Sequence, residues 1–409
     1  MTDERTAVPD ATPAESEGEV RPRVVLLGSG ELSRELAISL RRLGAEVIAI
    51  DGYAYAPAHA VADQSLVVTM TDGAELSTVI EGLQPDFVVT TTHAVAVEVL
   101  ETLGAQTEGD LTEVVPGARG VRLTGDREGL RRLAADQLGL PTAPFWFVGS
   151  VGELQAVAAH AGYPLLVMPV AGEGRALVKG PADIESAWRR AVGRPEAPQR
   201  VLAETVVEVE FHVTLLAVRS EGPRGPFIEF CSAIGHRRDE TQTLESWQPQ
   251  PMSDAALDAA KSIAARIIKA LGGRGVFGVE LMVNGDEVYF ADVTAYPPDT
   301  SWVTLRTQRL SAFELQARVI LGLAVDTMML SPGAARLIRA NHSIVAPDVL
   351  THALGVPESD VQVFGQAARS EPDAPRGLGM ALATAPDVAA ARDRAREVAS
   401  RLNMRDSRG

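Results

Sequence analysis

A glycine-containing loop between two short apolar segments is the first stretch of this sequence whose residue types suggest chemistry. The stretch is YPLLVMPVAGEGRALVKG, residues 163–180. A strand followed by such a loop is typical of phosphate binding, because glycine lets consecutive N–H groups approach the oxygen atoms closely. The centre of the strand, however, carries Met168, where a phosphate site needs a cation. The stretch therefore looks like a nucleotide-binding segment that lacks a cation at the centre of its strand.

A second glycine turn, Gly28-Ser29-Gly30, follows an apolar run and precedes an amphipathic segment. The pattern RVVLLGSGELSRELAISLRRLGAEVIAID predicts a strand, a helix and a second strand that ends at Asp51. The full GxGxxG pattern is absent, because position 33 is serine. Two interpretations stay open: a tight turn between strand and helix, or an anion held at the helix N-terminus.

The elements that must position these loops fall into successive segments. Residues 1–22 are rich in Ala, Pro, Glu and Thr and are expected to be a disordered tail. Alternating strands and helices predict a doubly wound N-terminal domain over 23–125. Residues 126–325 read as helices and antiparallel strands, with a clear hairpin turn at Asn284-Gly285-Asp286. A small α+β domain is expected over 326–404.

Composition narrows the class of protein. The 409 residues carry a net charge of -16, which argues against nucleic acid or an anionic membrane as a partner. Cys231 is the sole cysteine, so no intramolecular disulfide forms within one chain, and a reducing cytoplasm is expected. There is no apolar run of eighteen residues and no signal-peptide pattern. We expect a cytoplasmic protein that acts on a small molecule.

Five stretches together resemble one family: VVLLGSGELSREL, DREGLRRLAA, ESWQPQPMS, FGVELMVNGDEVYF and PPDTSWVTL. They are similar to the formate-dependent phosphoribosylglycinamide formyltransferases of the ATP-grasp superfamily, and the similarity extends over about residues 23–404. The resemblance implies a doubly wound N-terminal domain, a central ATP-grasp domain at 126–325 and a small C-terminal domain, assembled as a homodimer. It also implies a reaction in which ATP phosphorylates formate and the amine of glycinamide ribonucleotide attacks the formyl phosphate.

Several positions keep the residue types of the family. Those that contact the ribonucleotide substrate in the family are Glu31, Leu32, Asp299 and Arg376. The resemblance implies ATP contacts at Arg127 and Glu204, and magnesium ligands at Glu280 and Asp292. The last two lie on strands joined by the predicted hairpin, which suits two carboxylates converging on one hard cation.

The ATP side also departs from the family pattern. Met168 replaces a lysine, which removes an interaction of roughly 1.5–3 kcal/mol by hydrogen bonding alone. The following loop is shorter and carries Glu173, which repels phosphate, while Arg175 and Lys179 remain as candidate replacement cations. His212 replaces the glutamate that binds the ribose.

The ribonucleotide side departs as well. Thr91, Tyr296, Gln366 and Gly377 replace charged residues of the family. Because a dianionic phosphate normally needs several cationic donors, these losses predict a substrate without one. His93 lies two positions after Thr91 and, like His212, can act as an acid or base near neutral pH.

The candidate residues fall into three groups. The predicted catalytic residues are Glu31, His93, His212 and Asp299. The predicted ATP-binding residues are Arg127, Arg175, Lys179 and Glu204, and the predicted substrate-binding residues are Leu32, Thr91, Tyr296 and Arg376. For His236, in the stretch AIGHRRDE, a scaffold position and a pocket position stay equally open.

Three functions compete at this point. The first hypothesis is a divergent enzyme that acts on a small molecule other than glycinamide ribonucleotide, with ATP and Mg²⁺ implied by the family but weakly bound. The second is a working formate- and ATP-dependent transformylase of purine biosynthesis. The third is a catalytically inactive homologue that binds a metabolite. The lost cations place the first hypothesis ahead of the second.

Overall fold

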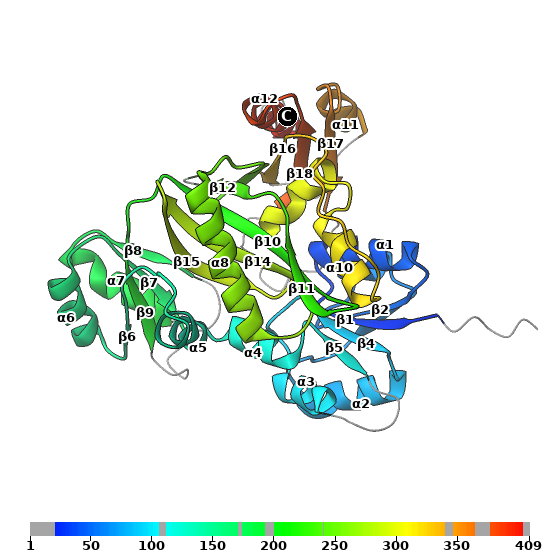
Figure 1. Ribbon diagram of the computed structural model, residues 1–409, viewed down its shortest axis with the longest axis horizontal. Helices are drawn as coiled ribbons and strands as arrows, with labels where there is room; N and C mark the ends of the chain where they lie inside the picture. Colours follow the sequence, from blue (N-terminus) through cyan, green and yellow to red (C-terminus); the bar gives the residue numbers. More distant parts are fainter. Residues whose placement is uncertain are drawn as a thin grey trace, which may run out of the picture.

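The computed structural model describes residues 21–105, 112–170, 174–192, 200–239, 241–339, 347–364 and 377–403. Figure 1 shows a doubly wound lobe, a small lobe on the opposite side and a large sheet between them. Within the described ranges, no helix is long and apolar enough to cross a membrane. The predicted mixed α/β and α+β fold is confirmed. The domain boundaries at 22, 125 and 325, and the disorder of the tail, stay predictions.

The N-terminal sheet has five parallel strands in the order β3-β2-β1-β4-β5. They are β1 (Arg23–Leu27), β2 (Glu46–Asp51), β3 (Gln64–Val67), β4 (Phe87–Thr90) and β5 (Glu113–Val115). The helices of this part are α1 (Glu31–Arg42), η1 (Pro57–Ala60), α2 (Gly73–Leu83), α3 (Val97–Gly104) and α4 (Ala118–Gly125). The chain direction across the sheet reverses at β1, and in sheets of this type ligands bind beyond the strand ends at such a point. The Gly28–Gly30 turn and residues 91–93 lie at that place.

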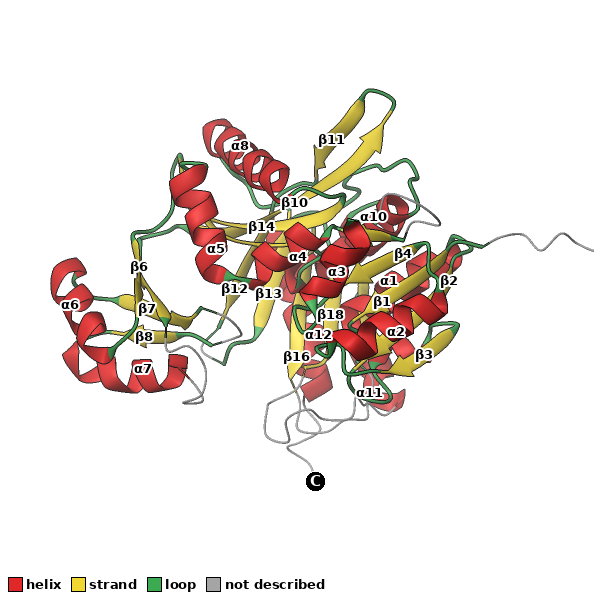
Figure 2. Cartoon of the chain, turned by 90° about the horizontal axis from the view of Figure 1, so that it is seen from below, coloured by secondary structure: helices red, strands yellow, loops and turns green. Residues whose placement is uncertain are grey.

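The small lobe is a four-stranded antiparallel sheet in the order β6-β9-β7-β8. Its strands are β6 (Phe145–Val148), β7 (Leu165–Pro169), β8 (Ala176–Val178) and β9 (Val201–Thr205). Its helical elements are α6 (Val151–Ala161), η3 (Pro181–Asp183) and α7 (Ile184–Val192), and Figure 2 shows α6 and α7 together on one side of the sheet. The pairing of β7 with β8 confirms the hairpin expected from residues 163–180.

The central sheet follows the order β15-β14-β10-β12-β13-β16-β18-β17, with β11 paired to β10. The strands are β10 (Phe211–Gly222), β11 (Gly225–Phe230), β12 (Ile234–Arg238), β13 (Leu244–Gln248), β14 (Gly275–Asn284), β15 (Glu287–Thr294), β16 (Gly333–Arg339), β17 (Ser359–Val363) and β18 (Gly377–Thr384). The last three strands belong to the predicted C-terminal segment, yet they join this sheet through the pairing of β13 with β16.

Helices cover the two faces of the central sheet unequally. The helical elements of this part are α5 (Arg127–Arg132), η2 (Leu133–Gln137), α8 (Asp254–Leu271), η4 (Asp299–Val303), α9 (Thr304–Thr307), α10 (Ala312–Ile320), α11 (Pro347–Ala353) and α12 (Val388–Asn403). One face, here called the back face, packs Val213, Val279 and Leu281 against α8 and Trp247 against α12. Because side chains alternate along a strand, the residues between these point to the opposite face, here called the front face. The front face carries the polar residues described next.

Candidate active site

Cross-strand pairing gathers the polar residues of the front face into two rows. Glu280 on β14 is opposite Asp292 on β15 and Thr214 on β10. In the next row, His212 on β10 is opposite His236 on β12. Directly paired residues in antiparallel strands point to the same face. Two acids and two histidines from four strands therefore share one surface.

The two acids form a site that favours a cation. Burial, and then the charge of Asp292, raise the pKa of Glu280 to about 7, while Arg175 and Arg238 oppose the shift. A bound cation would relieve this repulsion, and carboxylate oxygens are the ligands that Mg²⁺ prefers. Among the described residues no group of three or more metal-ligating side chains is found. The pair thus fits a Mg²⁺ ion whose remaining ligands come from phosphate oxygens and water.

Arg175 lies in the cleft between the small lobe and the central sheet. Its positive charge acts on five groups from five different elements, which are Arg127, Glu204, His212, His236 and Glu280. Because such interactions weaken with distance, the exposed Arg175 side chain lies on the side of the small lobe that faces the central sheet. Lys179, the other candidate cation, is exposed at the end of β8, where its backbone N–H donates to Asp183.

The strand position of Met168 faces the same cleft. Met168 is buried and pairs with Leu202, while Leu166 two residues earlier pairs with Glu204. The apolar core of the small lobe includes Leu165 and Val167 from the opposite face of β7. Position 168, which lacks a cation, and Arg175, which supplies one, therefore face the same cleft.

Glu204 and Arg127 mark the small-lobe side of this cleft. Glu204 accepts from Arg131 at 2.7 Å, and both side chains are buried. Burial raises the pKa of Glu204, against the charges of Arg131 and Arg175. The Arg127 guanidinium donates to the carbonyl oxygen of Pro169 at the end of β7. This contact ties the start of α5 to the glycine-containing loop.

The two histidines are neutral in this environment. Burial, and then the charge of Arg175, lower the pKa of His212. Burial, and then His212 and nearby arginines, lower the pKa of His236 to about 3. The ring centroids are 6.0 Å apart. His236 therefore lies beside His212 on the front face of the sheet.

At the N-terminal sheet, Thr91 closes the glycine turn. Its hydroxyl donates to the carbonyl oxygen of Gly28 at 3.1 Å and lies 2.7 Å from the hydroxyl of Ser33. Gly28 has a φ of +90°, and a Cβ there would lie 2.9 Å from Thr91 Oγ1. The turn thus needs glycine both for its backbone angle and for its contact with Thr91.

His93 connects the N-terminal sheet to the acid pair. Its ring centroid lies 5.8 Å from that of Tyr296. Burial lowers the pKa of His93, and the carboxylate of Asp292 opposes the shift. Asp299, which begins η4, is close enough to Glu280 to raise its pKa. His93, Tyr296 and Asp299 thus converge on the acid pair from three segments.

Glu31 and Leu32 begin α1 beside this region. Glu31 lies 3.4 Å from Arg34, whose guanidinium also donates to the carbonyl oxygen of Val363 at the end of β17. Leu32 packs against the buried cluster that contains Trp302 of η4. The start of α1 therefore contacts the central part of the molecule.

Three residues of the sequence argument, Glu173, Gln366 and Arg376, lie outside the described residues. Two functional candidates were missed, Arg131 and Arg238. Alternation along β12 puts Arg238 on the same face as His236, and this pattern in the sequence could have identified Arg238 as a candidate. No pattern in the sequence indicates a role for Arg131, because its partner Glu204 is 73 residues away in the chain.

Comparisons with known proteins agree with this geometry. A family model described as the ATP-grasp domain matches residues 133–313. The formate-dependent phosphoribosylglycinamide formyltransferase of Corynebacterium glutamicum (strain R) is 46% identical over 390 residues, which is 93% of this chain and 94% of the relative. The namesake from Rhodococcus jostii (strain RHA1) is 45% identical over 389 residues, with the same coverage. The chain belongs to this family.

Solved structures extend the comparison. The structure described as glycinamide-RNase-transformylase T from Mycobacterium tuberculosis has 66% sequence identity and a TM-score of 0.80, covering 93% of this chain and 100% of that chain. A carboxyaminoimidazole ribonucleotide synthase from Aspergillus clavatus complexed with ATP has 20% identity and a TM-score of 0.80, covering 94% of this chain and 99% of that one. At 20% identity, the similarity to the synthase shows a shared fold and nothing about function.

These relatives correct the leading hypothesis from the sequence. A divergent enzyme for a molecule other than glycinamide ribonucleotide was wrong, since relatives this similar over 93% of the chain are named for formate and phosphoribosylglycinamide. The physical reason lies in the cations. The sequence argument counted charges lost at single aligned positions of the ribonucleotide side, such as Tyr296, and such a count does not show which other side chains enter the site.

Proposed function

We propose that this protein is a formate- and ATP-dependent phosphoribosylglycinamide formyltransferase of purine biosynthesis. The observation that carries the proposal is the position of Arg175, whose charge acts both on Glu204 and on the acid Glu280. A cation at that place supplies the phosphate interaction that Met168 lacks. The family relationship supports the same conclusion.

The ATP side of the site has distinct roles for its residues. Arg127 and Arg175 bind phosphate oxygens, and Glu204 with its partner Arg131 defines the opposite end of the nucleotide cleft. His212, as a neutral imidazole, hydrogen-bonds the ribose hydroxyls in place of a glutamate. Lys179 is as exposed as Arg175, but it has no role in this proposal because its charge is not among the main influences on Arg127, Glu204 or Glu280.

Magnesium would be held by Glu280 and Asp292, where it would neutralise charge on the phosphates. Their cross-strand pairing and mutual repulsion support this assignment. The hairpin between β14 and β15 keeps the two carboxylates at a fixed separation, so they need no rearrangement when the ion binds.

The acceptor side is formed by the N-terminal sheet and η4. Glu31, Leu32, Thr91 and Tyr296 position the ribonucleotide, and Asp299 orients its amine. His93 is neutral and lies near Asp292, so it can accept the proton that the amine loses when it attacks the formyl carbon. Arg376 remains a proposed phosphate contact outside the described residues.

The test is direct. The purified protein with formate, ATP, Mg²⁺ and phosphoribosylglycinamide should release ADP and form the N-formyl product. Release of ADP should require formate. Absence of formylation refutes the proposal, and binding of the ribonucleotide without turnover would favour the inactive-homologue alternative.

A matched pair of variants tests the role of Arg175. Arg175→Met should weaken MgATP binding roughly 10- to 100-fold, because a charge-assisted interaction is lost, whereas Lys179→Met should bind MgATP as the unmodified protein does. Adding Met168→Lys to Arg175→Met should restore part of the affinity. Equal affinities of the two single variants, measured by calorimetry, would contradict the compensation.

Assembly as a homodimer also stays a proposal, supported by the family resemblance alone. Light scattering coupled to size-exclusion chromatography tests it, and a monomeric mass at micromolar concentration would refute it.

A further inference from the structure

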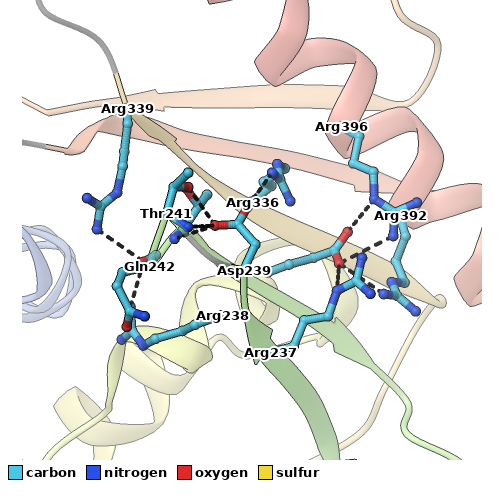
Figure 3. Close-up of polar contacts among 11 residues, drawn as sticks. Arg237, Arg238, Asp239, Thr241, Gln242, Arg336, Arg339, Arg392 and Arg396 are labelled. Atoms are coloured by element: carbon cyan, nitrogen blue, oxygen red, sulfur yellow. Dashed lines mark hydrogen bonds and ion pairs between the residues drawn. The ribbon is translucent and has the colours of Figure 1, made fainter. Parts of the chain in front are cut away.

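Two consecutive arginines on β12 point to opposite faces of the central sheet. Arg237 is opposite Glu245 of β13 and forms an ion pair with it at 2.7 Å. Arg238 follows the alternation to the other face, which it shares with His236. Figure 3 shows the two side chains leaving the strand in different directions, with Arg238 beside Gln242.

The environment of Arg237 explains it as a structural residue. Glu245 is 1% exposed and also pairs with Arg392 and Arg396 of α12, at 2.9 and 2.7 Å. This cluster fastens α12 to the back face of the sheet. The carboxylate keeps two of its three arginine partners when Arg237 is replaced.

The environment of Arg238 is different. The residue is exposed, and among the described residues its guanidinium donates one long hydrogen bond, 3.4 Å, to the carbonyl oxygen of Gln242. Its charge nevertheless acts on Glu280 and on His236. An exposed guanidinium on the face of the acid pair, whose charge acts on Glu280, has the properties of an anion-binding group.

A second observation points to a ligand at the same place. The Nε2 atom of His236 is buried and has no hydrogen-bond partner among the described residues. Unpaired buried polar atoms are uncommon and costly, and they mark places where a ligand or water completes the bonding. His236 and Arg238 lie two residues apart on one face of one strand, so a single group can contact both.

We propose that Arg238, with His236 beside it, binds the phosphoryl group that passes from ATP to the carboxylate substrate. The proposal rests on the proposed function for the identity of that carboxylate. Glu280 and Asp292 would hold a metal that neutralises charge on the terminal phosphates, so a cation whose charge acts on Glu280 would meet the terminal phosphoryl group. Arg127 and Glu204 lie on the small-lobe side and contact the rest of the nucleotide.

The transfer can be written with all bonds balanced. An oxygen of formate attacks the terminal phosphorus, and the bond from that phosphorus to the bridging oxygen breaks, so ADP leaves with the electron pair. The amine then attacks the formyl carbon, the carbon–oxygen bond to phosphate breaks, and the amine loses one proton. Arg238 contacts the phosphoryl oxygens in both steps and stabilises the charge that spreads over them.

The experiment compares two nucleotides in two variants. Calorimetry in excess Mg²⁺ measures the Kd of ADP and of the non-hydrolysable β,γ-imido analogue of ATP. The unmodified protein should bind the analogue more tightly than ADP. Arg238→Met should weaken the analogue roughly 10- to 100-fold and change ADP by no more than about twofold. Arg237→Met, the neighbouring control, should leave both affinities unchanged.

Several results would overturn the proposal. They are equal weakening of both nucleotides by Arg238→Met, no weakening of either, or an unmodified protein that does not prefer the analogue. These outcomes are separate from the fate of the proposed function. Formylation by the unmodified protein tests that function, and the nucleotide affinities test Arg238 whether or not formate is the carboxylate.

Discussion

Replacing Glu280 by glutamine should stabilise the protein in the absence of metal and nucleotide. The pKa of Glu280 is about 7, against an ordinary value of 4.5. At about 1.4 kcal/mol for each pKa unit, this difference corresponds to about 3 kcal/mol. The folded state binds this proton more tightly than the unfolded chain does. Stability is therefore lost as the pH rises from about 4.5 to about 7 and stays low above that range.

Glu280→Gln removes this cost because the amide carries no charge at any pH. We expect its free energy of unfolding at pH 8 to exceed that of the unmodified protein by up to about 3 kcal/mol, and the difference to shrink strongly at pH 5. The assay is urea unfolding with EDTA, followed by tryptophan fluorescence, since Trp247 on β13 and Trp302 on η4 report on the same sheet.

The control is Glu208→Gln, which alters an exposed carboxylate and should leave the pH dependence unchanged. A Glu280→Gln variant that is no more stable at pH 8, or whose advantage is the same at both pH values, would refute the argument that the acid pair is strained without a cation. The same variant should lose its Mg²⁺-dependent nucleotide binding.

Three further expectations concern packing. Cys231 is 3% exposed and burial raises its thiol pKa to about 12, so a thiol reagent should label the native protein at least roughly 100-fold more slowly than the urea-unfolded chain. Gly273 has a φ of +68° and a Cβ there would overlap the carbonyl oxygen of Pro116, so Gly273→Ala should lower the melting temperature sharply in a thermal scan. Arg131→Met leaves the Glu204 carboxylate buried without its partner and should cost about 3–5 kcal/mol in urea unfolding, most of which an added Glu204→Gln should restore.

Local patterns in the sequence predicted much of this architecture. The apolar run before Gly28 and the amphipathic segment after it predicted β1 and α1, and the Asn284-Gly285 turn predicted the hairpin that brings Glu280 opposite Asp292. Such signals involve residues close in the chain, where alternation and turn chemistry fix the geometry. The family resemblance named the two acids, and the predicted hairpin indicated that they lie on neighbouring strands.

The pairing of strands far apart in the chain and the geometry of the loops could not be predicted from the sequence. Strand β16 pairs with β13 across about 85 residues, and nothing in either strand names its partner. The position of Arg175 depends on how the chain returns to the sheet at β8, so sequence alone could not show that its charge reaches Glu204 and Glu280. The wrong hypothesis about the substrate arose separately, from counting the charges lost at Tyr296, Gln366 and Gly377.

The turn that joins β12 to β13 has a consequence for how this protein can change. Asp239 accepts hydrogen bonds from the backbone N–H groups of Thr241 and Thr243, and Arg336 of β16 also donates to it (Figure 3). Burial alone would raise the pKa of Asp239, but these bonds together lower it to about 2. A slip of one residue in this hairpin would send every side chain of β12 to the opposite face. One inserted residue would then turn Arg238 to the face of α12 and Arg237 to the face of the acid pair, so the two arginines would change roles. The number of residues in this short turn is therefore constrained more strictly than their types.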